Sequence, residues 1–384
     1  MPEPSLSRKV SASTDPAAVA RDLVADLPSS VAGGVIFVDA ELDVDRVRAE
    51  LAQRVSQPFV GVTSCRGVGS DLGLSRAVGL WFCDGVDVLE CALASTPAAL
   101  VGELESRLDG PDVNACFAFC TPGQDPTLLS ALKGSFGEAT MITGGGAADT
   151  DVSGRWRVFD RSRAVGEGCV ALAALWPGRI LPTFNSGYLP SSKTAAATQV
   201  EGQVLVQLDG RPAAEVYDEW TGGLLGEALR EGGVVLDKTT LRPLGVTRVR
   251  VGSVPAYTLL HPERVRRHDG ALALFAEVNE GETVTMMHTT RRSLLRRGAQ
   301  ILDHALDRGG LRPEDLAAAV IVNCGGCRIA IGDEAETMLK ATSEKLPNVP
   351  YAMPFTFGEF GNILPGKTSH GNLMLSALLF EHPR

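Results

Sequence analysis

Short apolar runs bounded by glycine, proline and polar residues recur along the chain, and longer amphipathic stretches separate several of them. A short apolar run is typical of a buried strand, whereas apolar positions three and four apart are typical of a helix. In the first half this pattern predicts strands at 34–38 and 59–63, helices at 44–54 and 127–136, and a close succession of strands over 156–201. The mixture predicts a mixed α/β (α+β) fold, in which helices flank sheets that contain many antiparallel pairs.

The second half repeats this rhythm and adds a hairpin signal, Asp209-Gly210, which proline and a helical stretch follow. A chain of 384 residues is long for a single hydrophobic core. We therefore expect two layered domains with a cleft between them, at residues 31–203 and 204–384. Residues 1–30 are expected to form a mobile leader, because proline, serine and threonine are frequent at their beginning.

The stretch richest in chemical groups begins at the apolar residues 319–322, which Asn-Cys-Gly-Gly-Cys-Arg follows. It predicts a buried strand that turns into a helix, and α/β folds place their sites at such turns. We expect Cys324, at the end of the strand, to expose its thiol, and we expect the helix and Arg328 to favour the thiolate. Cys327 is a ligand contact, a redox partner or a small buried thiol, and the context does not match a thioredoxin-type unit. Because no second Cys-x-x-Cys exists, we expect no metal site and no cofactor.

Four polar residues near the C-terminus complete this candidate site. Arg328 offers the two-pronged geometry that binds a carboxylate, or else it forms an interdomain ion pair. Glu359 lies among aromatic residues, which suits amine recognition or general-base work, or else it bonds loop amides. His370 and Asn372 either face the ligand or belong to a plain loop. Cys324, His370 and either Glu359 or Asn372 also have the residue types of a nucleophile, a base and an orienting group.

Composition and charge narrow the possible partners. A net charge of −10 and a pI near 5.2 argue against a nucleic-acid or anionic-membrane partner, and the one basic cluster, 264–268, is expected to be a solvated loop. No apolar run approaches the ~20 residues of a membrane helix, and residues 1–13 do not have the apolar segment of a signal peptide. The eight cysteines show no framework spacing. We therefore expect a cytoplasmic protein with reduced thiols.

Six stretches, in this order, resemble the FIST family, which has an N-terminal and a C-terminal section called FIST N and FIST C. The resemblance covers nearly the whole chain, and its carriers are Gly61-Val62-Thr63-Ser64-Cys65, Gly144-Gly145-Gly146-Ala147-Ala148-Asp149, residues 206–217, Asn323-Cys324-Gly325-Gly326-Cys327-Arg328, Phe357-Gly358-Glu359 and His370-Gly371-Asn372. The resemblance implies a sensory domain that binds a small ligand, with amino acids as the proposed class. The chain carries no kinase, cyclase or methyl-accepting segment, so a stand-alone member is expected to signal through a separate partner.

The family's glycine-rich stretches add residues from the first half to the candidate site. Ser64, Cys65, Gly145 and Gly146 are expected to close over the same cleft, or else to serve tight turns that need glycine's backbone freedom.

Two functional hypotheses follow from these residues. In the first, the chain is a ligand-binding module in which Arg328 and Glu359 contact opposite poles of a small zwitterion. In the second, it is a cysteine-dependent enzyme, a hydrolase, acyl transferase or cyclase acting on a small acyl or amide substrate, with Cys324 as nucleophile and His370 as base. A scaffold that binds only a protein partner remains open as a third, although it leaves the polar cluster unexplained.

Overall fold

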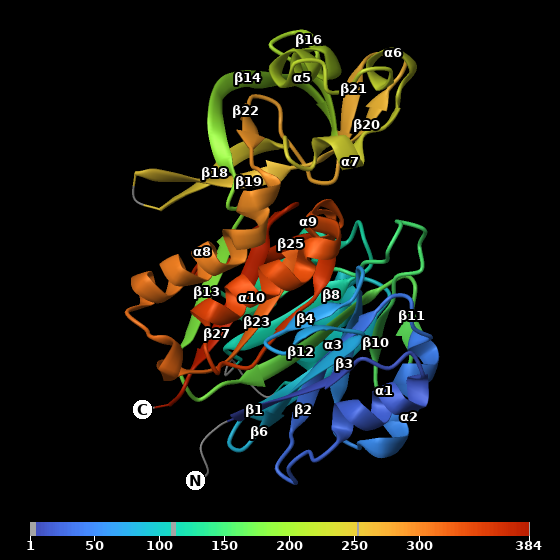
Figure 1. Ribbon diagram of the computed structural model, residues 1–384, viewed down its shortest axis with the longest axis vertical. Coiled ribbons are helices and arrows are strands. Elements are labelled where there is room, and N and C mark those ends of the chain that lie inside the picture. Colours follow the sequence, from blue (N-terminus) through green and yellow to red (C-terminus); the bar gives the residue numbers. More distant parts are fainter. Residues whose placement is uncertain (1–4, 109–112, 252, 384) are drawn as a thin grey trace.

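The computed structural model describes residues 5–108, 113–251 and 253–383, and it has a large lower body and a smaller upper body (Figure 1). The upper body contains residues 189–288, and the lower body contains the rest of the described chain. The strands of both bodies form mixed and antiparallel sheets, and helices lie on the faces of these sheets. The predicted mixed α/β fold with two layered domains is therefore confirmed.

The first sheet of the lower body is built from the N-terminal part of the chain. Two helices, α1 (Pro16–Val24) and α2 (Val44–Arg54), start at aspartate caps, where Asp15 and Asp43 accept backbone N–H groups of the first turn. Their apolar faces pack on one side of the sheet. Its strand order is β1 (Ser5–Ser11), β6 (Ala77–Cys83), β2 (Gly33–Asp39), β3 (Phe59–Ser64), β10 (Val158–Asp160) and β11 (Ala164–Val165).

Parts of the segment expected to be a mobile leader form regular structure, namely strand β1 and helix α1. Strand β1 pairs antiparallel with β6 along its whole length, from Ser5 opposite Cys83 to Ser11 opposite Ala77. The backbone N–H and C=O groups of a strand form hydrogen bonds with the neighbouring strand even where the side chains are polar. Composition alone therefore did not predict β1. Residues 1–4 lie outside the described residues.

The second sheet crosses the lower body and joins strands from the first half of the chain to strands near the C-terminus. Helices α3 (Pro97–Arg107) and α4 (Asp125–Phe136) contact its strands, as do α8 (Arg291–Gly309) and α9 (Gly325–Ile331), and α10 (Ala335–Lys345) packs on α8. Its main order is β5 (Gly73–Ser75), β4 (Val68–Ser70), β24 (Tyr351–Met353), β23 (Leu316–Cys324), β25 (Phe355–Leu364), β9 (Met141–Gly146), β8 (Ala115–Cys120), β12 (Cys169–Leu175) and β7 (Asp87–Ala94).

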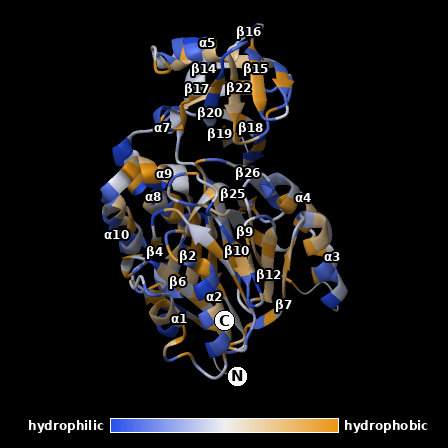
Figure 2. Cartoon of the chain, turned by 90° about the vertical axis from the view of Figure 1, so that its right-hand side faces the viewer, coloured by the Kyte–Doolittle hydropathy of each residue, from blue (hydrophilic) through white to orange (hydrophobic). Residues whose placement is uncertain are grey.

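Three further strands extend this sheet. Strand β27 (Leu375–Glu381) pairs with β23 and with β13 (Ile180–Asn185), and β26 (Lys367–Gly371) pairs with β25. Short 3-10 turns η1 (Pro313–Asp315) and η2 (Gly332–Glu334) precede β23 and α10. The strands of this sheet are strongly apolar where helices cover them (Figure 2). Strands near the C-terminus thus lie between strands from the first half.

The upper body has its own sheet and its own core. Helices α5 (Ala213–Thr221), α6 (Ala228–Glu231) and α7 (Leu236–Thr239) accompany it, and its buried cluster comes entirely from residues 195–286. The strand order is β17 (Gly233–Val234), β20 (Pro262–Arg266), β21 (Ala271–Leu274), β15 (Val204–Leu208), β14 (Leu189–Glu201), β22 (Thr283–His288), β18 (Leu244–Val251) and β19 (Val254–Leu260), with β16 (Arg211–Pro212) beside β15.

The basic cluster at 264–268 is not the solvated loop that we expected, because most of it belongs to strand β20. Val265 is buried and pairs with Leu272, and Arg266 binds Asp269 and Glu201. Successive side chains of a strand point to opposite faces, so the apolar and the charged residues lie on different faces of β20. Within the described part of the chain, no helix is long and apolar enough to span a membrane.

Candidate functional site

Strand β23 ends at Cys324 and helix α9 begins at Gly325, so the predicted strand-to-helix turn is confirmed. The expected exposure of the Cys324 thiol is wrong, because only 4% of the residue is exposed. Burial raises the pKa of this thiol well above its usual value, and contact with Cys327 adds to the effect. The expected preference for the Cys324 thiolate is therefore also wrong.

A partly open cavity of about 160 Å³ lies against this turn. Much of its wall is apolar, with Trp156, Phe357, Phe275 and Ile329 among the lining residues. A few polar groups interrupt that wall, which is the usual composition of a small-molecule pocket. They are Asp125, His261, Cys324, His370 and Asn372.

Asp125 is the cavity residue that sequence reasoning missed. It is the first residue of α4 and is 4% exposed. Oδ2 accepts the Gly123 N–H at 3.2 Å, whereas Oδ1 has no hydrogen-bond partner of standard geometry among the described residues. Burial raises the pKa of this carboxyl to about 7, despite the neighbouring Cys120 thiol, which lowers it. An aspartate followed by proline signals only a helix start, so no local pattern marked Asp125 as a site residue.

Asn372 and His370 reach the cavity from the end of β26 and the turn after it. The Asn372 backbone N–H donates to Leu259 O, but its side-chain Oδ1 has no partner within the described chain, although the residue is 5% exposed. Burial lowers the pKa of His370 to about 4, and Arg248 lowers it further, so the imidazole is neutral near pH 7. His370 also lines a neighbouring pocket of about 300 Å³, which Arg248 lines too.

His261 brings the upper body to the cavity wall. It follows β19, is 3% exposed, and its Nε2 lies 3.2 Å from Leu236 O and 3.3 Å from Thr240 Oγ1. Burial lowers its pKa to about 4. Nothing in the sequence near His261 marked it as a site residue, because its neighbours in space come from distant parts of the chain.

Glu359 lies deeper than the cavity and is completely buried. Its Oε2 accepts the Met374 N–H at 2.9 Å, and its Oε1 accepts the Thr356 hydroxyl at 3.2 Å. Burial raises its pKa well above the usual value, and the nearby Cys324 sulfur raises it further. The structure therefore puts Glu359 behind the Cys324 turn and not among the lining residues.

Arg328 is turned away from the cavity. Its guanidinium donates to the backbone oxygens of Gly332, at 2.6 Å, and Arg66, at 3.3 Å, and it lies over the Phe355 ring. Burial lowers its pKa. Arg328 thus ties α9 to the loop after β3.

The residues predicted from the first half form the frame beneath the cavity. The Ser64 hydroxyl donates to Gly67 O and accepts the Phe355 N–H at 2.8 Å, and Cys65 N–H donates to Phe355 O. Burial raises the pKa of Cys65 to about 12. These bonds hold the start of β25, which carries Phe357 to the cavity.

Gly145 and Gly146 lie on β9, where they pair with β25. A Cβ on Gly145 would overlap Gly358 O, and a Cβ on Gly146 would overlap Phe357 O and lie 2.9 Å from Asp125 Oδ1. Neither lines the cavity. Their small size lets β25 and Asp125 approach β9 closely.

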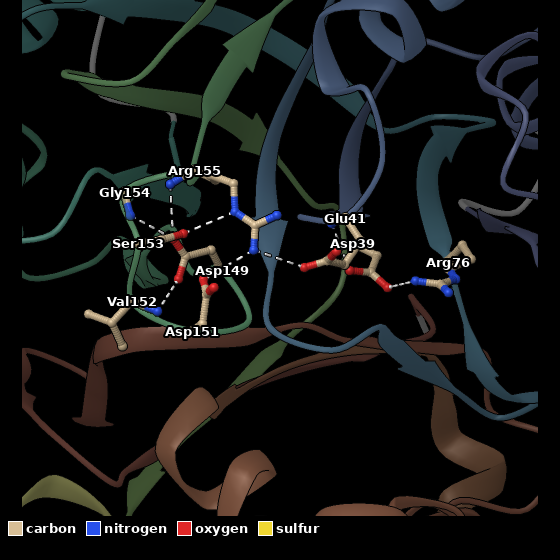
Figure 3. Close-up of polar contacts among 9 residues, drawn as sticks. All are labelled: Asp39, Glu41, Arg76, Asp149, Asp151, Val152, Ser153, Gly154 and Arg155. Carbon is tan, nitrogen blue, oxygen red and sulfur yellow. Dashed lines mark hydrogen bonds and ion pairs between the residues drawn. The ribbon is translucent and has the colours of Figure 1, made fainter.

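The loop that Asp149 holds in place supplies one wall of the cavity. Figure 3 shows the polar contacts of this loop. The buried Asp149 carboxylate accepts the backbone N–H groups of Val152, Gly154 and Arg155 at 2.6 to 2.9 Å. Arg155 in turn reaches Glu41 at 3.2 Å. This network fixes the loop that contains Val152. Val152 and Trp156 both line the cavity.

Two family models match the chain and together cover most of it. The FIST N domain matches residues 33–211 and the FIST C domain matches residues 213–362. The mixed α/β fold, with a cavity lined by residues from both halves of the chain, agrees with this two-part architecture. The chain belongs to the FIST family, whose domains are generally sensory, ligand-binding domains of signalling proteins. No curated protein matches the chain.

The described residues around the cavity do not form a cluster of metal ligands. Across residues 5–108, 113–251 and 253–383, no three His, Cys, Asp or Glu side chains gather as a metal site would require.

Proposed function

We propose that the chain senses a small, amino-acid-like molecule that binds in the cavity at Asp125, Cys324, His370 and Asn372. The observation that carries this proposal is a pair of buried side chains in the cavity wall, Asp125 and Asn372, whose Oδ1 atoms have no hydrogen-bond partner of standard geometry among the described residues, although the Cys120 thiol lies beside the Asp125 carboxyl. Leaving a buried polar atom unpaired costs about 1–3 kcal/mol, so a ligand that bonds both atoms recovers that free energy.

The wall chemistry defines the kind of ligand. Two acceptors require N–H or O–H donors, and a protonated amine beside the Asp125 carboxylate gains a charge-assisted hydrogen bond. The aromatic rings of Trp156 and Phe357, in edge contact at 6.4 Å, suit a short apolar body. The proposed ligand therefore carries an amine at one end and a small apolar group at the other. We propose that occupancy is read by a separate signalling partner.

Isothermal titration calorimetry tests this proposal with free amino acids and the matching amines at pH 7.5. We expect at least one compound to bind, and we expect Asp125→Asn to weaken it at least about tenfold, because a hydrogen bond to a charged group contributes about 1.5–3 kcal/mol. Asp237→Asn is the control, because Asp237 is exposed on α7 next to the cavity residue Leu236. Equal affinities of the two variants, or no binding by any compound, would contradict the proposal.

A cysteine-dependent enzyme is the second candidate, because Cys324 and His370 line the same cavity. The neutral imidazole of His370 is in the form that accepts a proton from a thiol. This candidate expects iodoacetamide to label one thiol rapidly near neutral pH, and it expects Cys324→Ala to abolish turnover while substrate still binds. Eight thiols that all react slowly would rule it out.

A further inference from the structure

We propose that Cys324 and Cys327 form a redox-active dithiol, which a small hydroperoxide entering the cavity oxidises reversibly to a disulfide. This activity is independent of ligand binding, although Cys324 belongs to the same cavity wall. It rests on three observations: the spacing of the two thiols, a buried cation beside them, and the access that the cavity gives to one of them.

The local structure puts the two thiols side by side. Cys324 is the N-cap residue of α9 and Cys327 is the third residue of that helix. Residues three apart on a helix have Cβ atoms about 5–6 Å apart, whereas a disulfide needs Cβ atoms about 3.5–4.5 Å apart. The two thiols already interact by a side-chain hydrogen bond. Closing the bond therefore needs side-chain rotation and a small shift of the first turn of α9, which brings the two Cβ atoms closer by about 1–2 Å.

A buried guanidinium stabilises negative charge at this pair. Arg297 is 1% exposed, and its donors go to the oxygens of Ser186, Leu373 and Met374 and to the Asn323 side chain, all of them uncharged. A buried cation needs an anion nearby. Glu359 is disfavoured as that anion, because burial raises its pKa well above the usual value.

The Cys327 thiol is the better counter-charge. Its pKa is lowered: the Cys324 thiol and Arg297 stabilise the thiolate against the opposing effect of burial. The Tyr188 hydroxyl lies 3.7 Å from Cys327 Sγ and 2.9 Å from Thr240 O, so it can turn to donate to the ionised sulfur. The pKa of Cys324 is thus shifted up and that of Cys327 down, so Cys324 is the hydrogen-bond donor and Cys327 the acceptor of the pair.

The two thiols differ in their access to the cavity, and this difference assigns them different roles. Cys324 lines the cavity, whereas Cys327 does not. In the proposed reaction the Cys324 proton passes to the Cys327 thiolate, and Cys324 sulfur attacks one peroxide oxygen. The O–O bond breaks, the leaving oxygen takes a proton to form water or an alcohol, and Cys324 becomes a sulfenic acid. Cys327 sulfur then attacks Cys324 sulfur and expels hydroxide, which takes the Cys327 proton to become water; two thiols are oxidised and one peroxide is reduced.

The other cysteines provide a contrast within the same chain. Burial raises the pKa of Cys116 and Cys169 to about 12 and that of the partly exposed Cys91 to about 11. Cys120 lies opposite Cys169 on paired strands, but burial and the neighbouring Asp125 carboxyl raise its pKa well above the usual value. Only the pair at the cavity combines a neighbouring thiol, a buried cation and access.

Peptide mapping of the full-length, reduced protein after brief treatment with stoichiometric hydrogen peroxide tests this proposal. Remaining thiols are blocked in denaturant before digestion. We expect a loss of 2 Da on the peptide that holds Cys324 and Cys327, reversed by dithiothreitol, before any oxidation at Cys91. A first disulfide between Cys120 and Cys169, or oxidation that begins at Cys91, would overturn the proposal, and neither result needs a variant to fold.

Single-site variants separate the roles of the two thiols. Cys327→Ser is expected to stop at a Cys324 sulfenic acid, which dimedone traps after unfolding. Cys324→Ser is expected to slow peroxide consumption at least about tenfold, because none of the remaining thiols lines the cavity. Cys91→Ser is the matched control and leaves the rate unchanged. Peroxide consumption by folded Cys324→Ser at the wild-type rate would contradict the assignment. Ligand titrations use the reduced protein, so each proposal can fail without the other.

Discussion

Asp125 is a carboxyl group whose charge opposes folding near neutral pH. Its pKa in the folded chain is raised to about 7 by burial, whereas an unfolded aspartate titrates near 3.8. Between these two values the folded state keeps a proton that the unfolded chain has released. The free energy of unfolding therefore falls as pH rises through this window, by roughly 1.4 kcal/mol per pH unit from this group.

Asp125→Asn is expected to remove this pH dependence, because asparagine has the same shape and no charge. Urea unfolding of both proteins at pH 5 and pH 7 measures the difference. We expect the variant to gain about 2–3 kcal/mol relative to the wild type between the two pH values. If the gap between the proteins does not change with pH, the raised pKa of Asp125 is wrong.

Individual cavity residues were predictable only where they lie close together in the chain. Cys324, His370 and Asn372 follow or end strands of one sheet, and the sequence brings them within a short stretch. Asp125 and His261 reach the same cavity from helix α4 and from the upper body. No local pattern encodes that meeting, because the tertiary packing of distant segments creates it.

Arg328 illustrates the same limit from the opposite side. Its residue type and position suggested a ligand contact, but its guanidinium donates to backbone oxygens of Gly332 and Arg66. Unpaired carbonyls at a helix end are strong acceptors for a nearby cation. The direction of a long side chain depends on such local acceptors, which sequence spacing does not reveal.

At the scale of elements, the cavity depends on how closely β25 packs on β9. Gly146→Ala tests this packing, because the new methyl group would overlap Phe357 O and crowd Asp125. We expect a loss of about 1–3 kcal/mol in unfolding free energy, the usual cost of overpacking, together with weaker ligand binding. Thermal and urea unfolding measure the loss.

Gly134→Ala is the matched control for this substitution. Gly134 lies within α4, and a Cβ there would meet no atom within 4 Å. Alanine is favoured over glycine inside a helix, so we expect a gain of about 0.5–1 kcal/mol. Equal effects of the two substitutions would mean that the β9–β25 contact is not tight.

Elements with strong periodicity were predictable, and weakly patterned strands were not. The helix at 44–54 and the strand that ends at Cys324 are found as predicted. Strand β1 is polar and β26 is short, so neither has an apolar run that would mark it. Both exist because a neighbouring strand satisfies their backbone groups.

At the scale of the whole molecule, the upper body has the features of an independent folding unit. Its buried cluster is drawn wholly from residues 195–286, and Leu189 pairs with His288 where the chain enters and leaves. We expect a fragment of residues 189–288 to unfold cooperatively in urea, with dispersed amide NMR signals. Leu205→Asp, which puts a charge in that core, is expected to unfold the fragment, and an unstructured parent fragment would contradict the prediction.

The mixed α/β fold class was predictable, since it follows from the alternation of strands and helices. The strand order was not. Strand β23 pairs with β24, β25 and β27, and β25 lies against β9 from the first half. The β25–β9 pairing joins segments about two hundred residues apart, and each strand carries the same apolar pattern wherever it is inserted.

This strand order has a consequence for the newly made chain as it leaves the ribosome. Strands β4 and β9 present open edges until residues 351–361 have been synthesised, because β24 and β25 are their partners. The central sheet therefore completes only after residues 351–361 have emerged. Unpaired strand edges are a risk for edge-to-edge aggregation, and pairing between segments far apart in the chain is slow, so we expect the first half to be most prone to aggregation before that point.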